Sequence, residues 1–161
     1  MNGLNSKYFN TRLLIVGSGE ALDDLKNLAQ KLKIENQVVF AGSVPHHEVF
    51  NYIDLMDITV MAKSNWYGSP VKIFEYGAMG KAIIAPDVIP VRDVMIDAID
   101  GILVQPEQVA LTNALEKLFI DEKLRKNIAD NFKQKVLANH TWEKMAEKLL
   151  SSLSENFTVS A

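Results

Sequence analysis

Apolar residues along this chain follow two patterns, and the two patterns alternate. One consists of short runs of consecutive apolar residues, which fall at residues 13–16, 38–40, 58–62, 82–85 and 102–104. Continuous apolar runs of this length are typical of strands that are buried on both faces of a parallel sheet. The runs therefore predict buried parallel strands at these places.

Between and after these runs, apolar residues recur every three or four positions, which is the spacing of one helix face. Helices are predicted within residues 22–32, 49–56 and 70–77, and then within 109–118, 124–136 and 142–153. Thr141 is the expected N-cap of the closing helix. The alternation predicts an α/β fold: a Rossmann-like, doubly wound parallel sheet with right-handed crossovers, closing with three helices.

Composition narrows the possible classes of protein. A chain of 161 residues with 48% hydrophobic content fits one globular domain. The net charge of −3 argues against broad nucleic-acid binding, which needs a basic surface. No apolar run reaches the length of about 18 residues that a transmembrane helix needs, and residues 1–11 lack the apolar core of a signal peptide. Cysteine is absent, which excludes disulfides. A cytoplasmic location is expected.

The most informative segment lies between the third and fourth predicted strands and reads Gly-Ser-Pro-Val-Lys-Ile-Phe-Glu-Tyr from Gly68 to Tyr76. Ser69 suits the N-cap of a helix, and Pro70 suits its first position. A helix N-terminus offers amide groups and a positive dipole end to a phosphate. Glu75 follows about one and a half turns later, where its carboxylate can accept hydrogen bonds from ligand hydroxyl groups. The segment thus predicts a ligand that carries both groups.

This segment resembles the donor-binding motif of retaining GT-B glycosyltransferases, the group 1 family that moves sugars from nucleotide-sugar donors. Glu75 matches the second of the family's two motif glutamates, and residues 78–82 match the turn after it. Tyr67 stands where the family has its first glutamate, so the chain resembles the subgroup that reads Ser-Pro-x-Lys-x-x-Glu-Tyr. Further family motifs are matched in the right order by residues 13–20, 38–45, 101–106 and 140–142.

The resemblance implies a set of donor-binding residues and assigns no catalytic residue within this chain. Glu75 would hold the ribose, Lys72 the pyrophosphate, and Val44 would lie against the nucleobase. Tyr67 would stack on the sugar or the base. Lys72 also reads as a surface lysine, and Tyr67 as an aromatic packed with Trp66. The full set of donor-binding residues is Gly17, Gly19, Val44, Tyr67, Gly68, Ser69, Pro70, Val71, Lys72 and Glu75. No metal ion and no cofactor are expected.

The enzymes of this family have two domains, and this chain resembles only the second, donor-binding one. Residues 1–155 would form that domain and residues 156–161 a frayed tail. The first strand of the domain, which is central in the order 3-2-1-4-5-6, has no counterpart here. Its absence would leave two strands without their usual neighbour. Another polypeptide supplies this strand, the two strands re-pair, or the chain is part of a longer gene product.

The partners expected from this resemblance are a nucleotide sugar and the missing N-terminal domain or a complementary subunit. Self-association is expected too, because uncovered strand edges favour pairing with other chains. The N-terminal domain would bring a glycan or lipid acceptor, as in cell-envelope polysaccharide biosynthesis, and any peripheral contact with the inner membrane would come through the missing part. The isolated chain is expected to transfer no sugar.

Two alternatives to a transferase domain remain open on the sequence. The first is a non-catalytic subunit that binds a nucleotide or a protein partner. The second is a dinucleotide-binding domain, because Gly17 and Gly19 begin its glycine motif, but Leu22 occupies the place of the third glycine. His46 and His47 are adjacent, which makes a poor metal pair, and are expected at the surface.

Overall fold

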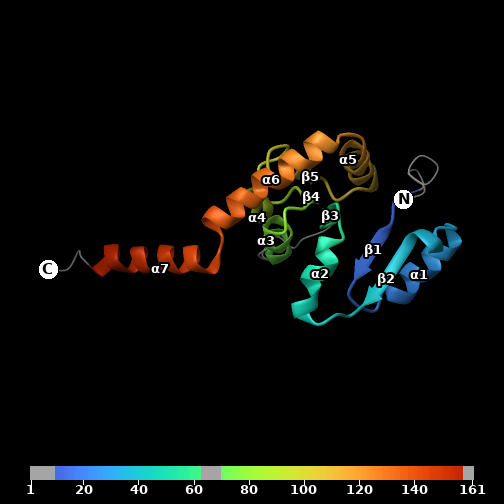
Figure 1. The fold of residues 1–161 in the computed structure, drawn as a ribbon, viewed down its shortest axis with the longest axis horizontal. Coiled ribbons are helices and arrows are strands. Elements are labelled where there is room, and N and C mark those ends of the chain that lie inside the picture. Colours follow the sequence, from blue (N-terminus) through green and yellow to red (C-terminus); the bar gives the residue numbers. More distant parts are fainter. Residues whose placement is uncertain (1–9, 63–69, 158–161) are drawn as a thin grey trace.

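The computed structural model describes residues 10–62 and 70–157, which form an α/β structure (Figure 1). The strands are β1 (Leu13–Val16), β2 (Val38–Gly42), β3 (Ile58–Val60), β4 (Ala82–Pro86) and β5 (Ile102–Val104). The α-helices are α1 (Leu22–Lys31), α2 (Val49–Asp54), α3 (Val71–Ala78), α4 (Ile89–Arg92), α5 (Gln108–Ile120), α6 (Glu122–Asn139) and α7 (Trp142–Phe157). Short 3-10 helices are η1 (Glu35–Gln37) and η2 (His46–Glu48).

The predicted α/β class and the parallel strands are confirmed, but the described strands form two sheets. β1 pairs with β2 in one sheet, and the order β3-β4-β5 makes the other. All three pairings are parallel. β1 and β3 do not pair with each other. The idea that these two strands re-pair in the absence of a central neighbour is therefore wrong for this structure.

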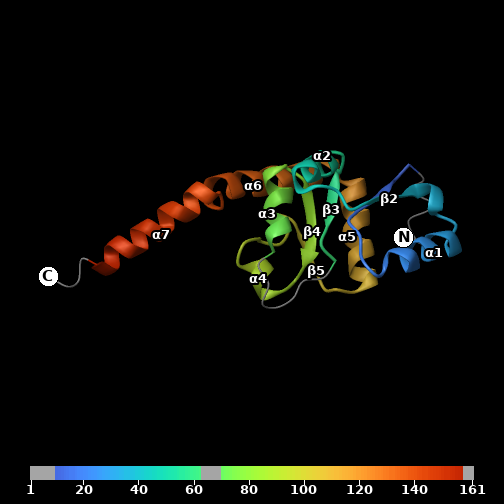
Figure 2. The ribbon, with the colours of Figure 1, turned by 90° about the horizontal axis from the view of Figure 1, so that it is seen from below.

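The core of the molecule surrounds β4, in which all five residues are buried. Its side chains alternate between two apolar layers, with α3 on one side and α5 on the other (Figure 2). The first layer contains Ile73, Ile83, Ala85, Val91, Met95, Phe132 and Val136. The second contains Ala82, Ile84, Ile102, Ala114, Leu118, Ile128 and Ala129. Helix α6 contributes to both layers and so ties α3 and α5 to the same sheet.

Helix α3, which carries the motif residues, packs closely on α6 at Gly77. This glycine is buried, and a Cβ atom added to it would lie 2.6 Å from Phe132 Cδ1 and 2.9 Å from Val136 Cγ2. A residue without a side chain is therefore required for the two helices to approach this closely. The position of α3 is thus fixed by core packing on the helix face opposite the solvent.

The ends of the helices agree with the sequence in part. The Thr141 cap is confirmed, because its Oγ1 accepts a hydrogen bond from the Lys144 amide at 3.3 Å. Helix α3 begins at Val71, so Pro70 is the capping residue and not the first helical one as predicted. Helix α7 extends away from the rest of the chain (Figures 1 and 2). Within the described residues, no helix combines the length and the apolar composition needed to cross a membrane.

Candidate functional site

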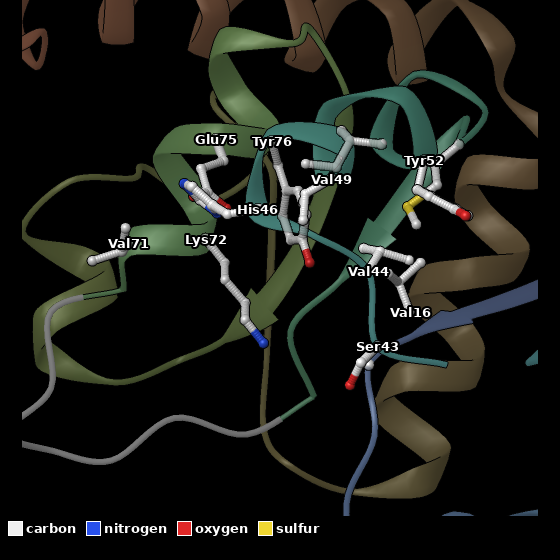
Figure 3. A pocket seen from close by; sticks show the side chains of 13 residues that line it. Val16, Ser43, Val44, His46, Val49, Tyr52, Val71, Lys72, Glu75 and Tyr76 are labelled. Atoms are coloured by element: carbon white, nitrogen blue, oxygen red, sulfur yellow. The ribbon is translucent and has the colours of Figure 1, made fainter. Parts of the chain in front are cut away.

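A pocket of about 450 Å³ lies between the end of β1, the loop after β2, helix α2 and the first turns of α3 (Figure 3). Both sheets contribute to it, since β1 belongs to one and α3 packs against the other. Its lining residues are Val16, Gly17, Ser43, Val44, His46, Val49, Tyr52, Ile53, Met56, Val71, Lys72, Glu75 and Tyr76. Ligands of parallel α/β sheets bind at this carboxyl edge of the strands.

Backbone is exposed to the pocket where β1 ends. Gly17 has φ +130°, a conformation that favours glycine, and no atom lies within 4 Å of the position that a Cβ would take. Its amide donates to the carbonyl of Gly42 at 2.7 Å, which continues the ladder of β1 and β2. The hydroxyl groups of Ser18 and Ser43 lie 2.5 Å apart and join the two loops. A ligand can therefore approach the main chain at Gly17 without meeting a side chain.

Helix α3 supplies the charged side of the pocket. Val71 and Lys72 stand at its first two positions, so the positive end of the helix dipole faces the same space as the Lys72 ammonium group. Glu75 lies one turn further along and is half-buried. Among the described residues, no hydrogen bond or ion pair is found for the side chains of Lys72 and Glu75, both of which line the pocket.

Tyr76 adds a phenol beside this carboxylate. Burial raises the pKa of Tyr76, and the negative charge of Glu75 raises it further. The phenol therefore keeps its proton at neutral pH and can donate a hydrogen bond. The pocket thus combines a cation, a carboxylate acceptor and a neutral hydroxyl donor along one helix.

The opposite side of the pocket is mainly apolar and comes from α2 and the loop before it. Val44 lies in that loop, and Val49 and Tyr52 lie on α2 (Figure 3). Met56, two residues after the end of α2, also lines the pocket. His46 lies at the rim with its ring centroid 6.2 Å from that of Phe50. Apolar and aromatic surface of this kind suits a planar ring.

The structure brings part of the predicted site together. Gly17, Val44, Val71, Lys72 and Glu75 line one pocket although they come from three separate segments. Pro70 caps α3 but is not a lining residue, and neither is Gly19. Tyr67, Gly68 and Ser69 lie outside the described residues. The ligand roles of all ten residues remain predictions.

Other lining residues were missed by sequence reasoning. His46 is exposed, as expected, but it also lines the pocket. Tyr52 and Met56 belong to the apolar stripe that predicted α2, and such a stripe does not say whether it faces a core or a cavity. Only Ile53 of that stripe is buried. Val49, Tyr52 and Met56 are partly exposed, and the sequence alone gives no sign of this exposure.

A second polar group lies at the same edge of the larger sheet. Asp87 directly follows β4, and it accepts hydrogen bonds from Arg92 Nη2 at 2.8 Å and from Gln105 Nε2 at 3.2 Å. The hydrogen bond from Arg92 is the main cause that lowers the pKa of Asp87. The polar groups of these three residues are thus paired with one another, and their hydrogen bonds connect the segments that follow β4 and β5.

No group of three histidine, aspartate or glutamate side chains that could hold a metal ion occurs in the described part of the chain. The described charges of the pocket are those of Lys72 and Glu75, with the dipole of α3 beside them.

The glycosyl transferases group 1 family model matches residues 1–135. The chain belongs to this family. A glycosyltransferase of Methanocaldococcus jannaschii, itself uncharacterised, is 29% identical over 139 residues, which are 84% of this chain and 35% of that protein. The alpha-D-kanosaminyltransferase of Streptomyces kanamyceticus is 28% identical over 121 residues, or 74% of this chain and 31% of that protein.

Solved glycosyltransferase structures share the fold. A glycosyltransferase from Rickettsia africae matches with a TM-score of 0.82 and 23% identity, over 99% of this chain and 43% of its own. Anabaena HepE, solved in complex with UDP, matches with a TM-score of 0.80 and 19% identity, over 90% and 41% of the two chains. This group 1 glycosyltransferase chain therefore spans about a third of its curated relatives and corresponds to one part of a GT-B structure.

Proposed function

We propose that this chain is the donor-binding part of a retaining glycosyltransferase and that its pocket binds the nucleoside diphosphate of a nucleotide sugar. The observation that carries the proposal is the composition of the pocket. A helix N-terminus with Lys72, the half-buried carboxylate of Glu75, and an apolar wall meet in one space. A phosphate, a ribose and a base need these three surfaces, respectively. The UDP complex of HepE, a structural neighbour, supports this choice of ligand.

In the proposed complex, the base lies against Val44 and the side chains of α2. The ribose hydroxyl groups donate to the carboxylate of Glu75, which can accept two hydrogen bonds at once. The diphosphate lies near the first turn of α3, where the helix dipole and Lys72 offset its negative charge. The same groups stabilise the charge that grows on the leaving nucleoside diphosphate during transfer, without a metal ion.

The acceptor belongs to a surface that this chain does not provide. In the proposal, the acceptor site and the other side of the cleft come from an N-terminal domain or a complementary subunit. The relatives carry out transfers of different kinds: one is the kanosaminyltransferase, and another is the alpha-monoglucosyldiacylglycerol synthase of Streptococcus pneumoniae. The proposal therefore covers a glycan or a lipid acceptor and does not choose between them.

The proposal is tested by calorimetric titration of UDP into Glu75→Gln. Loss of hydrogen bonds to a charged group costs about 1.5–3 kcal/mol, which corresponds to an affinity lower by about ten- to a hundred-fold. Glu116→Gln is the control, because Glu116 is also partly buried and lies on α5, away from the pocket. Its affinity for UDP should match that of the parent chain. Equal affinities for the two variants would remove Glu75 from the site.

A further inference from the structure

Two helices from different parts of the chain bound the pocket. Helix α2 supplies Val49, Tyr52 and Ile53, and the first turns of α3 supply the charged side chains of Lys72 and Glu75. Figure 3 shows side chains of both helices around one space. The width of this space therefore depends on how α2 is held relative to α3.

Helix α2 is weakly anchored by apolar packing. It is six residues long, and Ile53 is its one buried residue. Helices shorter than about 12 residues are marginal on their own in water, so α2 takes its stability from contacts with the rest of the chain. Among the described residues, the hydrogen bonds found between α2 and the segments that follow β3 are made by the ammonium group of Lys81. This lysine is therefore a main attachment of α2 to the larger sheet.

Lys81 bonds to the main chain at the end of α2. Its Nζ donates to the carbonyl of Asp54, the last residue of the helix, at 2.8 Å, and lies 3.4 Å from Oδ1 of the Asp54 carboxylate. The last carbonyls of a helix lack partners within it and form the negative end of its dipole, so a cation is stabilising there. The carboxylate is 72% exposed, whereas the lysine side chain is 13% exposed. Because exposed ion pairs contribute little, the bond to the carbonyl is the main part of this contact.

The main chain of Lys81 is itself fixed to the end of α3. The Lys81 amide donates to the Tyr76 carbonyl at 3.0 Å. The Gly80 amide donates to the Gly77 carbonyl at 2.8 Å, and Gly80 has φ +65°. Together these features form the Schellman motif that ends many helices. The next residue, Ala82, begins the fully buried strand β4. Lys81 therefore reaches α2 from a fixed point and joins the C-terminal ends of both helices.

We propose that Lys81 is a positioning residue of the donor pocket, which through its bond to the end of α2 sets the distance between the apolar wall and Glu75. This inference rests on the proposed function, since it takes the pocket to be the donor site. Lys81 does not line the pocket, so it acts through α2. Met56, just after α2, lines both the pocket and a second hollow of about 230 Å³ that Lys81 also lines. Without the bond, the ligand itself would have to order α2, and the affinity for the nucleotide would fall by that cost.

The first measurement is made without a nucleotide. Lys81→Met replaces the ammonium group with the apolar end of a side chain of similar length, so the Asp54 carbonyl loses its donor. Hydrogen exchange in residues 49–56 should become faster by about ten-fold than in the parent chain, while β4 and α6 keep their rates. An unchanged rate in residues 49–56 would overturn the proposal. Equal acceleration in β4 would show a loss of global stability in place of a local release of α2, and would overturn it too.

Lys126→Met is the matched control for this measurement. Lys126 also lines the second hollow, but its ammonium group pairs with Glu122 within α6. Exchange in residues 49–56 of this variant should equal that of the parent chain. Acceleration as large as that of Lys81→Met would show that any lysine of the hollow has the same effect, and the assignment to Lys81 would be wrong.

The second measurement is calorimetric titration of UDP. The affinity should fall by about ten-fold in Lys81→Met and return to within about two-fold of the parent value in Lys81→Arg, which keeps a cation within reach of the carbonyl. Unchanged affinity in Lys81→Met would overturn the proposal. Equal loss in both variants would show that the packing of the lysine stem matters and not its bond to Asp54, and would overturn it as well. If the parent chain does not bind UDP, the donor-site proposal fails, while the exchange measurement still shows whether Lys81 holds α2.

Discussion

The contact between α3 and α6 permits a sharp test of how the site is held in place. Replacing Gly77 with alanine adds one methyl group at the centre of this contact. The new Cβ would lie 2.6 and 2.7 Å from two ring carbons of Phe132 and 2.9 Å from a methyl group of Val136. Phe132 is fully buried and Val136 is 3% exposed, so neither can turn outward into water. The helices must separate or a core side chain must leave its preferred rotamer.

Two opposing effects set the magnitude. Overpacking a close-packed core costs about 1–3 kcal/mol. Alanine in place of glycine within a helix stabilises the folded state by about 0.5–1 kcal/mol. Because three contacts fall below 3.0 Å and involve buried groups, we place the packing cost in the upper part of its range. The expected net loss for Gly77→Ala is about 1–2 kcal/mol.

Urea unfolding followed by circular dichroism measures this loss, with Gly19→Ala as the matched control. A Cβ on Gly19 meets no atom within 4 Å, so its free energy of unfolding should change by no more than about 0.5–1 kcal/mol, in the stabilising direction. Gly77→Ala should also weaken UDP binding, since Glu75 and Lys72 lie on the helix that is displaced. A Gly77→Ala chain as stable as the parent would refute the packing argument.

Two further predictions follow from the charges of the described residues. UDP affinity should be equal in magnesium and in EDTA when measured by calorimetry, because α3 and Lys72 supply the positive charge; strict dependence on magnesium would contradict this. Burial lowers the pKa of His140, and the charges of Lys148 and Lys135 lower it further, so protonation opposes folding. The free energy of unfolding that depends on neutral His140 is fully present above about pH 6.5 and is lost as the pH falls through the lowered pKa. In urea titrations between about pH 7 and 5, the His140→Gln variant should therefore lose less stability than the parent chain.

The positions of the strands could be predicted because local composition decides them. The apolar runs at 13–16 and 102–104 coincide with β1 and β5, and the other strand predictions fall within two residues of β2, β3 and β4. Burial could not be predicted in the same way. The run in β4 is covered by helices on both faces, whereas the similar run in β1 is not, and only the three-dimensional arrangement separates the two.

The residues of the candidate site also fall into those that the sequence could predict and those that it could not. Gly17, Lys72 and Glu75 could be proposed from motifs in which each residue type has a local physical reason. Tyr52, His46 and Tyr76 could not, because their part in the pocket depends on how η2, α2 and α3 meet. The Asp87–Arg92 pair could not be predicted either, because α4 is a single turn and leaves no periodic pattern in the sequence.

The pocket lies at the boundary between the two sheets. Gly17 and Val44 come from the side of β1 and β2, and Lys72 and Glu75 come from the side of β3 and β4. The chain between them, η2 and α2, forms part of the wall. In the proposed complex, a nucleotide that contacts both sides fixes one sheet relative to the other. Any other contact that orders the two sheets relative to each other would then lower the ordering cost of nucleotide binding, and by linkage the nucleotide would favour that contact by the same factor.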